Sequence, residues 1–390
     1  MITRRHVFYL SGFDPRGPSF YHDLYKTESR HQVSSSGMPI HVANRTALSR
    51  HVARWDISAS ANGREVLTRY DFLRWDDIIR RHWTRNEGAL LLKTLTTFWL
   101  FLHTGLLRNA WKAAWKPTAL FMYPTALLTL TLAAGIVTGL ATGFLLGQAG
   151  ISFWLAVSGA LAAFLAILLL GRFISSKTSA YWILRLCNFC GTFGQGKSPD
   201  MEERLDEFVR IAAEEIRKGE ADEYLFVGHS LGAILAIPVL ARLLRNLENP
   251  GERNIALLTL GQCIPLVSFL PHASGFRHEL NEVANAGGIN WIDFSSPADP
   301  VCFALVDPIA SCGLTVPDTG RQSPRLLNAR FYKLIAEERY RKIRRDGKRM
   351  HFQYLMAGDM SGEYDFFAIT AGGLSLNERY TSEQHLRSQG

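Results

Sequence analysis

Two uncharged, strongly apolar runs lie next to each other in the middle of the chain. Residues 119–146 and 151–170 carry no charged side chain, and a helix of about 20 apolar residues is long enough to cross the core of a lipid bilayer. Only residues 147–150 (GQAG) separate the two runs. The sequence therefore predicts a transmembrane helical hairpin over residues 119–173, with an uncharged tip.

The excess of basic residues lies in the segment that contains this hairpin. The 390 residues have a formal net charge of +8, and residues 88–199 contain no Asp or Glu. The basic residues of this segment are Lys93, Arg108, Lys112, Lys116, Arg172, Lys177, Arg185 and Lys197. These eight account for the whole excess of 43 Lys and Arg over 35 Asp and Glu. We therefore expect the basic segment to contact a lipid bilayer, and we expect no nucleic-acid partner.

The same charges set the expected orientation. Basic flanks of transmembrane helices stay on the cytoplasmic side of the membrane. We expect an integral membrane protein of a bacterial inner membrane, with two transmembrane helices, and with both termini and the remaining domain in the cytoplasm. The first residues lead directly into a strand-like run, so we expect no signal peptide.

Small residues form a ridge along each predicted transmembrane helix. The first ridge consists of Gly135, Gly139, Gly143 and Gly147, and the second of Ser158, Ala162 and Ala166. Small residues at this spacing let helix backbones approach closely. We expect the two ridges to match within the hairpin, and they also allow a homo-oligomer held through the hairpin.

A third apolar segment, residues 89–118, is expected at the membrane surface. If the strands at residues 6–10 and 224–227 belong to one sheet, the chain must cross the membrane an even number of times between them. Trp111 and Trp115 stand beside lysines, which is the pattern of the headgroup region. We therefore predict an interfacial or re-entrant segment here.

The five cysteines do not indicate a disulfide framework. Their number is odd, and disulfides are rare in the cytoplasm. Cys187 and Cys190 form a single C-x-x-C pair with no second pair, which leaves a metal or redox role open. We favour two small apolar residues near the membrane surface, and we expect no metal and no cofactor.

Outside the membrane segment, strand-like and helix-like stretches alternate. The expected strands cover residues 6–10, 224–227, 255–260, 290–294 and 329–334, with two or three antiparallel strands in 38–71. The expected helices start near 19, 198 and 231 and cover 76–83 and 278–284. This alternation is typical of an α/β fold with a mostly parallel, doubly wound sheet. We predict that residues 1–88 and 198–390 build this domain, and that the membrane segment is inserted between them.

The most informative motif is the run Gly228-His229-Ser230-Leu231-Gly232. An apolar strand precedes it and an apolar helix follows it. A Ser on such a tight turn needs glycine on both sides, here Gly228 and Gly232, because a Cβ would collide with the neighbouring backbone. The pattern predicts that Ser230 is an exposed nucleophile. The alternative is a Ser that caps a core helix.

A catalytic serine needs a carboxylate and a histidine. Asp299 follows the strand that ends near residue 294, at the edge where the Ser230 turn also opens. Asp293, inside that strand, and Asp307, before a proline, are alternatives. We take Asp299 as the acid.

Two histidines follow Asp299 in the chain, His351 and His385. His385 lies in a polar tail, whereas His351 precedes an apolar stretch. We therefore take His351 as the base, with a structural role for the imidazole as the alternative. The order Ser230, Asp299, His351 supports this choice.

Together, the GHSLG turn, the Asp299 turn and His351 resemble an α/β-hydrolase of the lipase and esterase type. The resemblance covers about residues 1–35 and 198–365. It implies that Ser230 is the nucleophile, His351 the general base and Asp299 the residue that orients it. It also implies that His229 packs beneath the site.

Acyl transfer also needs donors for the oxyanion. The N–H of Leu231, directly after the nucleophile, is one expected donor. By the same resemblance, the second donor is the N–H of Phe13, and Gly12 permits the close approach. Ser11 stands where the family has His, which weakens this part of the match.

The sequence thus favours a membrane-anchored serine hydrolase that cleaves a lipophilic ester through an acyl-enzyme. Two alternatives stay open. One is a non-catalytic membrane scaffold with a hydrolase-like fold, and the other is an acyltransferase or thioesterase with the same triad. A basic run before the base, from Arg341 to Arg349, is either a solvated helix face or a contact for anionic headgroups or an acidic substrate.

Overall fold

The computed structural model describes residues 1–61, 63–315 and 324–381. Within these residues, nine strands form one sheet in the order β2-β4-β5-β1-β6-β7-β8-β9, and β3 pairs with β4. The strands are β1 Arg4–Leu10, β2 Ile40–Val42, β3 Thr46–Ala47, β4 Val52–Ala61, β5 Arg64–Leu73, β6 Glu223–His229, β7 Ile255–Leu260, β8 Asn290–Ser295 and β9 Arg325–Asn328.

The sheet is mostly parallel, as the sequence predicts. Every pair from β5 across to β9 is parallel, whereas β4 pairs antiparallel with β2, β3 and β5. Strands β2, β3 and β4 fall inside the segment 38–71 where antiparallel strands were expected, and β5 extends past it to Leu73. Strand β1 lies between β5 and β6, so the first and last parts of the chain share one sheet.

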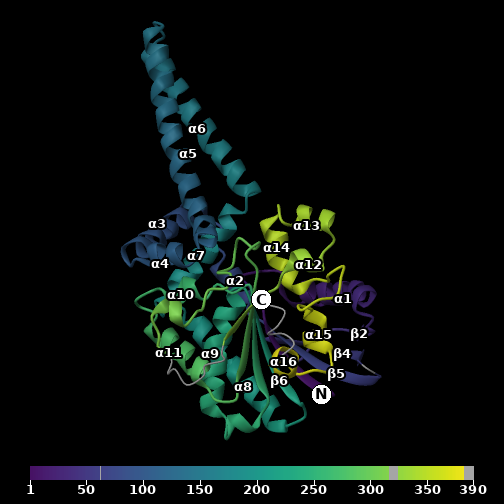
Figure 1. The fold of residues 1–390 in the computed structure, drawn as a ribbon. Helices are drawn as coiled ribbons and strands as arrows, with labels where there is room; N and C mark the ends of the chain where they lie inside the picture. Colours follow the sequence, from purple (N-terminus) through teal and green to yellow (C-terminus); the bar gives the residue numbers. More distant parts are fainter. Residues whose placement is uncertain (62, 316–323, 382–390) are drawn as a thin grey trace.

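Helices cover both faces of the sheet (Figure 1). The helices before β6 are α1 Gly17–Ser36, α2 Asp76–His82, α3 Glu87–His103, α4 Leu106–Ala113, α5 Trp115–Gln148, α6 Phe153–Lys177, α7 Ala180–Gly194 and α8 Pro199–Lys218. The later helices are α9 Leu231–Asn246, α10 Pro265–Ser268, α11 Ser274–Asn285, α12 Phe331–Leu334, α13 Glu337–Ile343, α14 Gly347–Phe352, α15 Phe366–Ala371 and α16 Leu376–Thr381. Short 3-10 helices are η1 Pro250–Glu252, η2 Ala310–Cys312 and η3 Gln353–Leu355.

Strand β1 shows why the sheet is covered on both faces. Phe8 and Leu10 belong to one buried core, with α7, α8, α9 and α11. Val7 and Tyr9 belong to the other core, with α1 and the helices from α12 onward. Successive side chains of a strand point to opposite faces, so a wholly apolar strand needs a helix layer on each side.

Helices α5 and α6 project from one end of the molecule (Figure 1). With 34 and 25 residues, they are the two described helices that are long and apolar enough to cross a membrane. They pack side by side over much of their length, and residues 149–152 join them. We call them the α5–α6 pair.

Gly135, Gly139 and Gly143 of α5 face α6, whereas Gly147 is exposed, and the predicted ridge of α6 does not face α5. A Cβ at Gly139 would lie 3.0 Å from the carbonyl oxygen of Ala160, and one at Gly135 would lie 3.0 Å from the Phe164 ring. Ser158, Ala162 and Ala166 are exposed instead. The prediction for α6 was wrong because repeat spacing does not say which face of a helix turns toward its neighbour, and here Ala160 and Phe164 face the glycines of α5 instead.

Helices α3 and α4 lie at the base of the α5–α6 pair (Figure 1). They meet at an angle of 71° at the break formed by Thr104 and Gly105. Several large apolar side chains of α3 are exposed: Leu91, Leu92, Leu95, Trp99 and Leu102. This bend and this surface are the features that an interfacial or re-entrant segment needs, and that assignment stays a prediction.

The last predicted strand was misplaced. Strand β9 covers Arg325–Asn328, and residues 331–334 form α12 instead of the end of a strand. The side chain of Asn328 accepts the N–H of Arg330, whose φ is 42°. This turn ends the strand, and apolar composition alone could not reveal it. The basic run that follows is divided between α13 and α14, and Asp346 caps α14 by accepting the N–H of Arg349.

Candidate active site

Ser230 occupies a strained turn between β6 and α9. Its φ is 59° and its ψ is −120°, a conformation that a residue with a Cβ rarely adopts. The N–H of Ser230 donates to the carbonyl oxygen of Leu260 at 2.9 Å, which ties the turn to the neighbouring strand β7. The strain persists because a parallel strand and a packed helix fix both ends of the turn.

The two flanking glycines are required by close backbone contacts. A Cβ at Gly228 would lie 2.6 Å from the Cα of Ala233, and one at Gly232 would lie 2.0 Å from the carbonyl oxygen of Leu10. Both distances are far below van der Waals contact. The collision expected from the sequence is therefore present, and Gly232 specifically lets α9 pack under the end of β1.

His351 and Asp299 form a buried pair. The Nδ1 of His351 lies 2.8 Å from the Oδ2 of Asp299, and the side chains are 4 % and 0 % exposed. The other carboxylate oxygen of Asp299 accepts the N–H of Val301 at 2.9 Å. Burial favours a higher pKa for Asp299, but the charge of His351 and these hydrogen bonds outweigh it and lower the pKa. The carboxylate is thus held ionised against one nitrogen of the imidazole.

The other nitrogen of this imidazole is unused. Within the described residues, His351 Nε2 is buried and has no hydrogen-bond partner. Ser230 and His351 line the same cavity, and the closest hydrogen-bonding contact of the Ser230 hydroxyl is Cys263 Sγ at 3.9 Å. Serine and histidine are therefore brought together without a direct hydrogen bond, and such contacts often tighten only when substrate is bound.

Ser230 is less accessible than the sequence led us to expect. Its residue exposure is 3 %. A Cβ at Gly12 would lie 2.9 Å from the Ser230 Cβ, so the loop after β1 lies directly over the serine. Ser230 therefore lies at the bottom of a cavity and not on an open surface.

This loop, residues 11–13, carries one of the two predicted oxyanion donors, and the other lies at the start of α9. No hydrogen bond in the described part of the chain uses the N–H of Phe13, and Leu231 is the first residue of α9, where helical N–H groups have no partner within the helix. Two indole groups hold the loop: Trp75 Nε1 donates to Ser11 O at 3.0 Å, and Trp182 Nε1 donates to Phe13 O at 2.9 Å. We call residues 11–13 the oxyanion loop.

The alternative acids occupy other positions. Asp293 lies within β8 and accepts a hydrogen bond from the Thr259 hydroxyl at 2.7 Å. Asp307 accepts the N–H groups of Ile309 and Ala310 in its own turn. The alternative base, His385, lies outside the described residues.

His229 supports the base from below. Its Nε2 donates to the carbonyl oxygen of His351 at 2.9 Å, and the two rings lie 4.9 Å apart. Burial, together with the charge of His351, lowers the pKa of His229 to about 3, so the ring stays neutral. This packing role agrees with the one inferred for His229 from the sequence.

Several supporting residues carried no sequence signal. Gly261 has a φ of 54°, and a Cβ there would lie 2.7 Å from the Tyr354 ring and 3.3 Å from Asp299 Oδ2. The Tyr354 hydroxyl lies 3.6 Å from Cys302 Sγ. These residues enclose Asp299, and only the packing of distant loops brings them there.

The cavity above Ser230 has a volume of about 320 Å³. The oxyanion loop and α14 line part of it, and the end of α6 and the start of α7, including Ser175 and Trp182, line another part. In addition, Lys116 Nζ at the start of α5 donates to Pro297 O at 2.8 Å, in the loop that leads to Asp299. The base of the α5–α6 pair is therefore part of the site.

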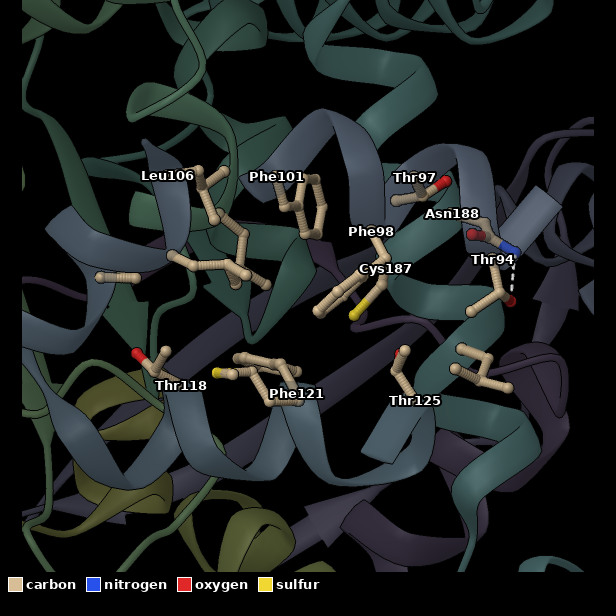
Figure 2. A pocket seen from close by; sticks show the side chains of 15 residues that line it. Thr94, Thr97, Phe98, Phe101, Leu106, Thr118, Phe121, Thr125, Cys187 and Asn188 are labelled. Carbon is tan, nitrogen blue, oxygen red and sulfur yellow. Dashed lines mark hydrogen bonds between the residues drawn. The ribbon is translucent and has the colours of Figure 1, made fainter. Parts of the chain in front are cut away.

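A second, apolar cavity lies between α3, α4, α5 and α7 (Figure 2). Phe101 and Phe121 face it from α3 and α5, and Cys187 faces it from α7. At one end Asn188 donates to the hydroxyl of Thr94 at 3.5 Å. No charged side chain lines this cavity, so we do not place acid–base chemistry there.

The C-x-x-C pair lies inside α7. Cys187 and Cys190 are both free and buried. Burial raises the pKa of Cys187 to about 12 and raises that of Cys190 as well. Both sulfurs are therefore protonated and belong to the apolar core. Among the described residues, no group of three or more His, Cys, Asp or Glu side chains could hold a metal ion.

No protein-family model, no curated protein and no solved structure matches this chain. Its function therefore has to be inferred from its own geometry.

Proposed function

We propose that this protein is a membrane-anchored serine hydrolase of the α/β-hydrolase type that cleaves an ester of a lipid or another lipophilic acyl compound. The observation that carries the proposal is the strained Ser230 turn beside the buried His351–Asp299 pair, with both groups on one cavity. A serine that only capped a helix would need neither the pair nor the cavity.

The chemistry follows from these groups. The Ser230 hydroxyl attacks the ester carbonyl while His351 Nε2 accepts its proton, and Asp299 keeps the imidazole oriented and stabilises its positive charge. The N–H groups of Leu231 and Phe13 stabilise the oxyanion. His351 then returns the proton to the leaving alcohol. A water molecule, activated by the same imidazole, hydrolyses the acyl-enzyme and regenerates Ser230.

The lipophilic substrate is inferred from the position of the site. The α5–α6 pair would anchor the chain as a transmembrane hairpin inserted in the hydrolase domain, and the exposed apolar side chains of α3 would lie in the membrane surface. The cavity above Ser230 is walled by the end of α6. Substrates that partition into a bilayer would thus reach the serine directly. Because the basic flanks of the hairpin would stay on the cytoplasmic side of the membrane, the catalytic domain and both termini would be cytoplasmic as well.

Labelling with a fluorophosphonate probe tests this proposal. We expect the full-length protein in detergent to become labelled, and Ser230→Ala to lose the label while keeping its far-UV circular dichroism. Ser34→Ala, an exposed serine of α1, is the matched control and should label normally. Folded protein that takes no label would instead favour a non-catalytic scaffold.

Turnover then identifies the reaction. We expect p-nitrophenyl esters of graded chain length to be hydrolysed, with a preference for longer chains. Transfer of the acyl group to an added alcohol, or a strong preference for thioesters, would show that the same triad serves an acyltransferase or a thioesterase.

A further inference from the structure

We propose that the cavity above Ser230 receives a membrane lipid with an anionic headgroup, and that Lys348 contacts the negative charge of that headgroup. The inference rests on the proposed hydrolase function and adds a substrate class to it. It is carried by the position of Lys348, by the charge balance of the cavity, and by an unsatisfied hydroxyl near the end of α6.

Lys348 stands beside the catalytic base. It precedes His351 by three residues on α14, so the two side chains share one face of the helix. Both line the cavity that contains Ser230. Lys348 is exposed, and within the described residues it has no ion-pair partner. An ester held at Ser230 would therefore have a free ammonium group next to it.

The other charges of the cavity neutralise each other. Asp14 and Arg16 form a two-pronged ion pair, with Arg16 Nη2 donating to Asp14 Oδ2 at 2.6 Å. Asp14 also accepts the Tyr21 hydroxyl, and the Arg16 guanidinium lies 3.5 Å from the centre of the Phe20 ring. With this pair satisfied and His229 neutral, Lys348 contributes the uncompensated charge of the cavity.

The part of the cavity lined by the end of α6 offers hydroxyl groups. Ser175, near the end of α6, is 1 % exposed, and its Oγ has no hydrogen-bond partner within the described residues. Ser176 and Ser179 line the cavity as well. A buried hydroxyl without a partner is destabilising, so a polar group that enters the cavity and accepts a hydrogen bond there would be stabilised. Phosphate oxygens are such acceptors.

The location also favours a lipid source for the anion. Ser175 belongs to the last turns of α6, the helix expected to leave the bilayer at this level, and α13 and α14 lie beside the base of the α5–α6 pair (Figure 1). No Asp or Glu occurs in residues 88–199. This side of the molecule is therefore attracted to anionic lipid surfaces, and the headgroup level coincides with the cavity.

The test uses the full-length protein in vesicles that contain phosphatidylglycerol or phosphatidylcholine with the same acyl chains. We expect the wild type to hydrolyse the anionic lipid faster. Lys348→Glu should lower the ratio of the phosphatidylglycerol rate to the phosphatidylcholine rate about 10-fold or more, as expected for the loss of a hydrogen bond to a charged group, and this ratio is read independently of any change in soluble-ester hydrolysis. Lys348→Arg should keep most of the preference, and Ser175→Ala should reduce it.

Lys342→Glu is the matched control. It makes the same change of charge on the neighbouring helix α13, where Lys342 is exposed, pairs with Glu338 at 3.1 Å and does not line the cavity. If Lys342→Glu lowers this ratio as much as Lys348→Glu, the effect is general attraction to the membrane and the inference is wrong. If glycerol phosphate inhibits the hydrolysis of a soluble ester as strongly as anionic vesicles do, then the cavity binds the phosphate group without the lipid. That result would overturn the lipid source.

The failure of this inference differs from the failure of the proposed function. A wild type that hydrolyses soluble esters but shows no preference for the anionic lipid overturns the role of Lys348 and leaves the hydrolase intact. A wild type that hydrolyses no ester at all, soluble or lipid, overturns both.

Discussion

At the scale of residues, the site depends on backbone contacts that are too close for an added Cβ. Ser230 keeps a φ of 59° because Gly228 and Gly232 allow backbone contacts that any Cβ would block. Gly12 lies equally close to the serine from the other side. The glycines of the turn could be identified from their spacing, whereas the role of Gly12 followed only from a family resemblance. Its contact with Ser230 joins residues more than 200 positions apart, and no local pattern encodes such a contact.

Replacing Gly12 by alanine tests the oxyanion loop. The new Cβ would lie 2.9 Å from the Ser230 Cβ, so the loop must shift and carry the Phe13 N–H away from the reacting oxygen. We expect kcat on a soluble ester to fall about 10²–10³-fold, the cost of losing one oxyanion donor. Gly251→Ala is the control, because nothing lies within 4 Å of its added Cβ. Equal activity of the two variants would exclude a role for this loop in catalysis.

At the scale of elements, the position relative to strand β8 distinguishes Asp299, the proposed catalytic acid, from Asp293. Asp299 lies beyond the end of β8, where a loop can bring it to His351, whereas Asp293 lies within the strand beside Thr259 of β7. The pattern of strands and turns could distinguish these two positions. It could not place β9 or the inner face of α6, because a turn at Asn328 and the shapes of facing side chains decide them.

The buried carboxyl of Asp293 should make stability depend on pH. Burial raises its pKa to about 7, and the hydrogen bond from Thr259 offsets this only in part. An unfolded Asp titrates near pH 4, as roughly expected from model peptides, so between about pH 4 and 7 the folded chain holds a proton that the unfolded chain has lost. Stability therefore falls as the pH rises through this window.

Asp293→Asn imitates the protonated carboxyl. We expect its melting temperature to exceed that of the wild type at pH 8, and the difference to shrink as the pH falls toward 5. Thermal unfolding in detergent at several pH values measures this. A difference that stays constant across the range would mean that Asp293 is ionised in the folded protein at low pH as well.

At the scale of the whole molecule, the proposed anchor and the proposed catalytic domain are joined at the site itself. Lys116 at the start of α5 bonds to the loop before Asp299, and Trp182 of α7 bonds to the oxyanion loop. A tethered enzyme would need only a linker between its two parts. Here the base of the α5–α6 pair forms a wall of the cavity, so a shift of this pair would change the shape of the cavity.

Single cysteines test the expected orientation. In bacterial cells that express the protein, Gln148→Cys at the tip of the α5–α6 pair should react with a membrane-impermeant maleimide without permeabilisation. Lys342→Cys on α13 should react only after the membrane is permeabilised. Four of the native cysteines are buried and Cys312 is partly buried, so the wild type gives the background. Labelling of both variants in intact cells would exclude the proposed topology.

The sequence by itself determined the features that neighbouring residues encode. These are the two apolar helices, the strand, turn and helix around Ser230, and the alternation that produces a mostly parallel sheet. Each depends on the spacing of apolar, charged and glycine residues within a short segment. Only the tertiary structure decided that the oxyanion loop covers Ser230, that the end of α6 walls the cavity and that Lys348 stands beside it. These contacts arise when distant elements pack together, because their relative positions depend on shape and burial across the whole fold.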